Sequence, residues 1–125
     1  MKVNLFTCGN RFRIEFVEQD NGRLSAWEAY RTLHKIEQAA VAVTLRKLAE
    51  TGRVSNREKF KKVEGSPLFE VKEFQHRFLG FFLKGARFVV ASYEIKKGGK
   101  LKPATIERAI DFKQQMEQEV VAHAR

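Results

Sequence analysis

The stretch LFEVKEFQHRFLGFF, residues 68–82, decides the expected fold, because two apolar runs flank a short polar connection. Successive side chains of a strand point to opposite faces, and the runs 68–74 and 77–83 carry apolar residues on both faces. Only Gln75-His76 separates them, which favours an antiparallel pair. A third run, 87–95, follows after three residues. The sequence therefore predicts a three-strand antiparallel meander.

Upstream of the meander, the pattern predicts one strand followed by helices. Residues 11–18, RFRIEFVE, alternate as a half-buried strand does, and residues 2–7 are a candidate partner across a Cys-Gly-Asn turn. Ser25 and the glutamate three positions later form a capping box, and helical spacing then continues to Gly52. One helix of that length would span about 40 Å, so we expect a break near residues 33–35.

After the meander, Pro103 begins a last helix with an apolar stripe. The polar, basic residues 52–67 are expected to form a loop. The order strand, helices, three strands, helix predicts an α+β domain with helices packed on one face of a mainly antiparallel sheet. At 125 residues, the chain fits a single domain, residues 1–125.

The composition predicts a globular protein with a polyanionic partner. Lys and Arg number 24 against 15 Asp and Glu, for a formal net charge of +9. Nucleic acid, an acidic protein and an anionic membrane surface would all suit this charge. One cysteine and three histidines cannot build the usual zinc cluster, so we expect no metal and no cofactor. The chain has no secretory apolar segment and no run of membrane-spanning length, so we expect a cytoplasmic protein without a membrane partner.

The charged residues inside the meander have two interpretations. In the first, Glu70, Lys72 and Arg77 form an ion pair or triad on an exposed sheet face, where such pairs contribute roughly 0.2–1 kcal/mol. In the second, Lys72 and Arg77 form a phosphate-binding surface together with the lysines that follow the third strand. Those lysines are Lys96, Lys97, Lys100 and Lys102.

Three segments in order resemble the RelE/ParE toxin superfamily, and specifically its HigB-like, phage-derived branch. The segments are KKVEGSPLFEVK, HRFLGFFLKGARFVVASYEIKK and KPATIERAI. Upstream, RIEFVEQDNGRLSAWEAYRTL is similar to the first strand and helix of that family. The resemblance spans residues 13–110, and it implies a RelE-like fold.

The resemblance implies the toxin of a bacterial type II toxin–antitoxin system. Most characterised relatives are metal-independent endoribonucleases (mRNA interferases) that cut mRNA, often on the ribosome, by attack of the ribose 2′-hydroxyl on the adjacent phosphorus. Such chemistry needs positioning and electrostatic stabilisation more than a dedicated nucleophile. Two alternatives stay open: a non-enzymatic inhibitor of DNA gyrase of the ParE type, and an inactive prophage-derived relative that still binds nucleic acid. The expected partner is a small cognate antitoxin, often with a helix-turn-helix domain.

The resemblance also assigns candidate catalytic residues. Arg77 matches the second-strand arginine, which would hold the scissile phosphate, and Lys72 stands where the preceding strand usually ends in arginine. Tyr93 is a candidate for base stacking or proton transfer. His76 replaces a tyrosine of the family and is a candidate acid or base, because histidine titrates near neutral pH. The alternative is an ordinary surface histidine.

The remaining assignments concern RNA binding and one departure. Lys96 and Lys97 match a lysine pair that would grip the RNA backbone, and Lys61 and Lys62 lie in a run that is either solvated or in contact with RNA. Many relatives carry a histidine where this chain has Ser92, which weakens the catalytic assignment but not the expected fold.

Overall fold

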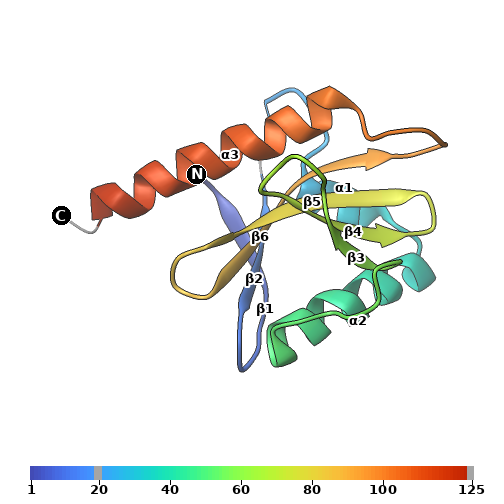
Figure 1. Ribbon diagram of the computed structural model, residues 1–125, viewed down its shortest axis with the longest axis horizontal. Coiled ribbons are helices and arrows are strands. Elements are labelled where there is room, and N and C mark those ends of the chain that lie inside the picture. Colours follow the sequence, from blue (N-terminus) through green and yellow to red (C-terminus); the bar gives the residue numbers. More distant parts are fainter. Residues whose placement is uncertain (19–20, 124–125) are drawn as a thin grey trace.

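A mixed β-sheet with the strand order β1-β2-β6-β5-β4-β3 forms the centre of the computed structural model, which describes residues 1–18 and 21–123 (Figure 1). The strands are β1 (Val3–Cys8), β2 (Arg13–Val17), β3 (Phe60–Lys62), β4 (Phe69–Glu73), β5 (His76–Leu83) and β6 (Arg87–Ile95). The helices are α1 (Ala26–Thr32), α2 (Lys35–Thr51) and α3 (Pro103–His123). The predicted α+β class is confirmed.

The meander is confirmed as β4, β5 and β6, which pair antiparallel in sequence order. The expected hairpin of β1 and β2 is also present. Beyond it, β2 pairs with β6 in parallel, from Arg13 beside Arg87 to Phe16 beside Val90. The short strand β3 extends the other edge of the sheet, in a region where the sequence predicts only a loop.

The helix boundaries follow local chemistry that the sequence reveals. The Ser25 hydroxyl accepts a hydrogen bond from the Glu28 backbone N–H at 3.1 Å and caps α1. The chain is extended at Leu33 and His34, so the predicted break is confirmed, and it separates α1 from α2. Gly52, at φ 79°, ends α2 in the left-handed conformation that glycine adopts without strain.

The expectation that all helices pack on one face of the sheet is wrong. Helices α1 and α2 cover one face, where Phe88 and Val90 of β6 lie, and α3 covers the opposite face over Val89 and Ala91 (Figure 1). Because the meander strands carry apolar side chains on both faces, one helical layer would leave one of these faces exposed to water. Each layer encloses its own apolar core.

A β-bulge in β6 changes the face on which its last residues lie. Leu79 pairs with Ser92 while Gly80 pairs with Val90, so Ala91 is an extra residue in β6. Strict alternation from Val90 would put Tyr93 on the α3 face. The bulge instead packs Tyr93 against the core under α1 and α2, on the face opposite to the one that alternation alone would give.

Candidate functional site

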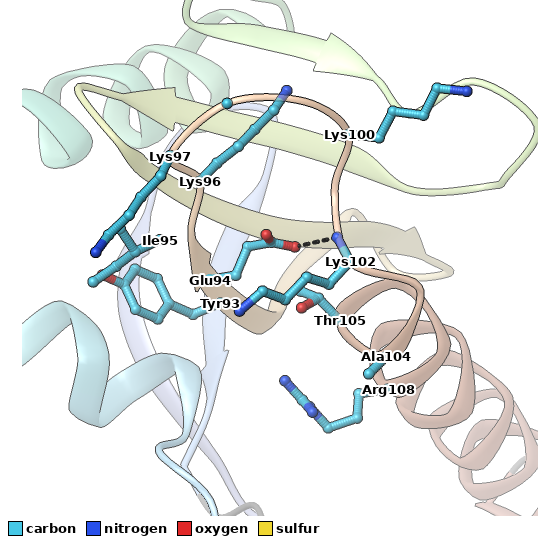
Figure 2. A pocket seen from close by; sticks show the side chains of 11 residues that line it. Tyr93, Glu94, Ile95, Lys96, Lys97, Lys100, Lys102, Ala104, Thr105 and Arg108 are labelled. Carbon is cyan, nitrogen blue, oxygen red and sulfur yellow. Dashed lines mark hydrogen bonds between the residues drawn. The ribbon is translucent and has the colours of Figure 1, made fainter.

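A basic pocket lies between the end of β6 and the start of α3 (Figure 2). It has a volume of about 700 Å³. The residues that give it its charge are Lys96, Lys97, Lys100, Lys102 and Arg108. The pairing of β2 with β6 stops at Val90, so the residues that line the pocket lie beyond the end of β2. The structure thus brings together the four lysines that the sequence predicts after the third strand, with Arg108 from the first turns of α3.

Backbone and side-chain hydrogen bonds fix both ends of the pocket loop. The Lys96 backbone N–H donates to the carbonyl of Gln75 at 2.8 Å. The buried Glu94 carboxylate accepts from the Lys102 backbone N–H at 2.9 Å, as the dashed line in Figure 2 shows. Between these points the chain turns through Gly98 and Gly99, both at positive φ. The ends of the loop are therefore anchored while its lysine side chains extend outward.

The pocket cations do not all point the same way. In Figure 2, Lys102 and Arg108 extend to the same side of the loop, whereas Lys100 extends away from them. Lys97 extends to the left in Figure 2, where Tyr93 and Ile95 also lie. Arginine offers a planar fork for two phosphate oxygens and lysine a mobile point charge, so this arrangement suits successive phosphates of one strand.

Arg77, the expected phosphate ligand, does not line this pocket. Its side chain is 8% exposed, and its Nη1 donates to the carbonyl oxygens of Phe74 and His76 at 2.7 and 3.0 Å. Its Nε lies 3.6 Å from Oε1 of the buried Glu70. The ion-pair interpretation is thus confirmed for Glu70 and Arg77, although the pair is buried where the sequence predicts an exposed one.

The other predicted cations lie away from the basic pocket as well. Lys72 shares the α3 face with Arg77, and its ammonium lies 3.5 Å from the carboxylate of Glu58. Lys61 and Lys62, on β3, line a separate pocket of about 340 Å³ together with arginines from the preceding loop. The predicted RNA-binding lysines therefore belong to two different surfaces.

His76 and Tyr93 meet on the α2 face, opposite Arg77. The Tyr93 hydroxyl lies 2.6 Å from Nδ1 of His76, and Nε2 of His76 lies 2.9 Å from Oε2 of Glu37 in α2. The side chains of His76 and Glu37 are only 14% and 22% exposed. We call these three residues the Glu–His–Tyr chain. Tyr93 also lines the basic pocket, so it joins the two features.

The surroundings of the Glu–His–Tyr chain shift two of its ionisations. The hydrogen bond from His76 holds the pKa of Glu37 below its ordinary value. Burial raises the pKa of the Tyr93 phenol, and the negative charge of Glu37 raises it further. Tyr93 is therefore a neutral phenol at physiological pH, and Glu37 is a carboxylate.

Sequence reasoning missed Glu37, Glu94 and Arg108. Glu37 stands three residues after His34 at the start of a helix, a position at which the sequence indicates a capping residue. Its Oε1 does accept a hydrogen bond from the His34 backbone N–H, at 3.3 Å.

Ser92 is buried, and its hydroxyl donates to the Thr105 carbonyl at 2.8 Å, so it anchors α3.

Comparisons with known proteins leave the family open. No protein-family model matches the chain, and neither the curated proteins nor the solved structures include a significant match. None of the helices formed by residues 1–18 and 21–123 combines the length and the apolar character that a membrane-spanning helix requires. The geometry of the site therefore carries the functional argument.

Proposed function

We propose that this chain is the toxin of a bacterial type II toxin–antitoxin pair with a RelE-like fold of the HigB-like branch. Its activity is that of a metal-independent endoribonuclease that cuts mRNA on the ribosome. The order β2, α1, α2, three-strand meander and α3 agrees with the order of segments on which the resemblance rests, and β1 and β3 are additional strands. The proposal locates the substrate on the basic pocket.

The observation that carries the proposal is the gathering of five cations around one pocket that Tyr93 also lines. Glu94 is the only acidic residue among the described residues of this lining, and its carboxylate is bound to the Lys102 backbone N–H. The pocket is therefore strongly positive, as a site for a polyanion requires. A neutral aromatic side chain beside lysines also suits a flexible strand, whose bases stack on aromatic rings.

The chemistry proposed for the pocket is transfer of the scissile phosphate from the 5′-oxygen of one nucleotide to the 2′-oxygen of its neighbour. The products are a 2′,3′-cyclic phosphate and a 5′-hydroxyl. Lys97, Lys102 and Arg108 are assigned to hold the phosphates and to stabilise the negative charge that develops on the equatorial oxygens. Arg77 is assigned a structural role instead, because its guanidinium is directed to the carbonyls of the β4–β5 turn.

The proposed antitoxin inhibits by covering the same charges. An acidic or amphipathic segment of the antitoxin would match the basic pocket in charge, and charge complementarity also speeds association. The proposal therefore predicts that RNA and the antitoxin compete for Lys102.

The direct test incubates the purified protein with ribosomes and a short message in the presence of EDTA. The expected result is cleavage that leaves a 2′,3′-cyclic phosphate. Lys102→Gln is expected to weaken binding of single-stranded RNA and to reduce the slope of log affinity against log salt by about 0.7. Lys84→Gln is the matched control, because Lys84 is exposed on the β5–β6 turn, outside the pocket lining.

An intact message would contradict the proposed activity. The burial of Arg77 favours one second candidate, a non-enzymatic gyrase inhibitor, because it takes the expected catalytic cation away from the phosphate. Inhibition of purified gyrase without RNA cleavage would support that candidate. Neither effect, with RNA binding retained, would indicate an inactive relative.

A further inference from the structure

The Glu–His–Tyr chain unites residues that are distant in sequence and that come from three elements. Glu37 comes from α2, His76 from the start of β5 and Tyr93 from the end of β6. Both ring nitrogens of His76 have a partner, at 2.6 and 2.9 Å. The bulge at Ala91 is what turns Tyr93 toward this face. Of these three residues, Tyr93 is the one that lines the basic pocket, so it is the one placed to contact a bound substrate.

The hydrogen bonds determine where the protons lie. A carboxylate only accepts hydrogen bonds, so Nε2 of His76 carries a hydrogen that it donates to Glu37. In the neutral ring, Nδ1 then has no hydrogen and accepts the Tyr93 hydroxyl. Glu37 is itself oriented, because its other oxygen accepts from the His34 backbone N–H. The phenolic oxygen of Tyr93 keeps lone pairs with which it can accept a hydrogen bond from another hydroxyl.

We propose that Glu37 is a positioning residue that holds His76 with Nδ1 as acceptor, so that Tyr93 and His76 together remove a proton from a substrate hydroxyl. This inference rests on the proposed function, in which the hydroxyl is the ribose 2′-hydroxyl of RNA bound to the basic pocket. The arrangement follows the general logic in which a carboxylate orients a histidine that accepts a proton from a hydroxyl.

The proton moves in two linked transfers. As the 2′-oxygen forms its bond to phosphorus, its proton passes to the phenolic oxygen of Tyr93, and the phenolic proton passes to Nδ1 of His76. The ring becomes an imidazolium that the Glu37 carboxylate stabilises. The bond from phosphorus to the 5′-oxygen breaks, and that oxygen takes a proton from a lysine ammonium of the basic pocket. The high pKa of Tyr93 fits this sequence, because a free tyrosinate does not have to form first.

The imidazole ¹H–¹⁵N correlation spectrum tests the tautomer without any reaction. In its neutral form, His76 is expected to show a hydrogen on Nε2 and an acceptor at Nδ1. Tyr93→Phe is expected to change the Nδ1 shift alone, since it removes the hydroxyl and keeps the ring. A hydrogen on Nδ1 with a bare Nε2 would overturn the inference.

Single-turnover cleavage tests the role of the charge on Glu37. Glu37→Gln retains an oxygen that can accept from His76 but removes the charge that stabilises the imidazolium. The cleavage rate is expected to fall about 10²-fold or more, the range in which a proton acceptor contributes, while affinity for RNA stays within about twofold of wild type. Glu28→Gln removes the same charge from an exposed position on α1 and is expected to leave the rate unchanged.

The two proposals fail in different ways. Equal cleavage by wild type and Glu37→Gln would overturn the role of Glu37 and leave the endoribonuclease assignment intact. If the wild type leaves the message intact, the proposed function fails, and the tautomer then decides alone whether Glu37 holds His76 as inferred.

Discussion

Arg77→Ala is expected to destabilise the fold before it affects any chemistry. In the folded protein, the guanidinium donates to the carbonyls of Phe74 and His76 and lies beside the carboxylate of Glu70. Phe74 has a φ of 52°, an unfavourable conformation for a non-glycine residue, so the turn depends on contacts that hold it. Truncation of Arg77 removes those contacts and leaves a carboxylate without its counter-ion in a site that is 2% exposed.

The loss of the counter-ion dominates the expected cost. Removal of one partner of a buried ion pair typically costs about 3–5 kcal/mol, because the remaining charge stays desolvated. Hydrogen bonds from a charged donor contribute about 1.5–3 kcal/mol each, but water can replace part of this at a turn. A domain of this size has an unfolding free energy of about 5–15 kcal/mol. We therefore expect Arg77→Ala to lose about 3–5 kcal/mol, a large part of the total.

Urea denaturation followed by far-UV circular dichroism measures this loss. The matched control is the double variant Glu70→Leu with Arg77→Met, which replaces both charges by apolar groups. It is expected to recover at least about 2 kcal/mol relative to Arg77→Ala, since no unpaired carboxylate remains. A loss below about 1 kcal/mol in Arg77→Ala, or no recovery in the double variant, would refute the structural role. Arg77 would then again be a candidate for the phosphate.

Two further predictions concern the bulge and the Glu–His–Tyr chain. Gly80→Ala places a Cβ 2.5 Å from the Val89 carbonyl oxygen, so we expect it to lower the unfolding free energy by about 1–3 kcal/mol in urea denaturation; unchanged stability would contradict this close approach. Because the folded-state pKa of Glu37 lies below its ordinary 4.5, its carboxylate stabilises the fold fully above that value and loses this effect as pH falls through the lowered pKa. The stability difference between wild type and Glu37→Gln, measured by thermal unfolding, is therefore expected at pH 6 and absent in strong acid; a difference independent of pH would contradict it.

The elements were predictable from the sequence because their signals are local. A capping serine, a terminal glycine and the spacing of apolar residues each act within one or two turns, so α1, α2 and the meander follow from short windows. The side of the sheet on which α3 packs has no such signal. The strand β3 also lacks one, because it has only three residues, two of them exposed lysines, and its single core residue is Phe60.

The site was predictable in part, and the reason lies in register and sequence distance. His76 and Tyr93 were candidates by residue type, but strict alternation sets Tyr93 on the wrong face, because an extra residue such as Ala91 leaves no mark in the apolar pattern. Glu37 is 39 positions from His76 in the chain, a contact that no periodicity reports. The burial of Arg77 could not be predicted from the sequence for a different reason. Arginine is seldom fully buried unless it is paired, and the pairing depends on the tertiary fold.

The charged and titratable residues within the meander have different roles because they lie on opposite faces of the sheet. Arg77 and Glu70 point toward the α3 side and form a buried pair that holds the β4–β5 turn. His76, the immediate neighbour of Arg77, points toward α2 and meets Tyr93. A stable turn sets the first residue of β5 in place, so the buried pair also positions His76. Loss of activity in an Arg77 variant is therefore expected even though the guanidinium of Arg77 does not line the pocket. Only a measurement of stability distinguishes loss of activity through a displaced His76 from loss of a direct contact between Arg77 and RNA.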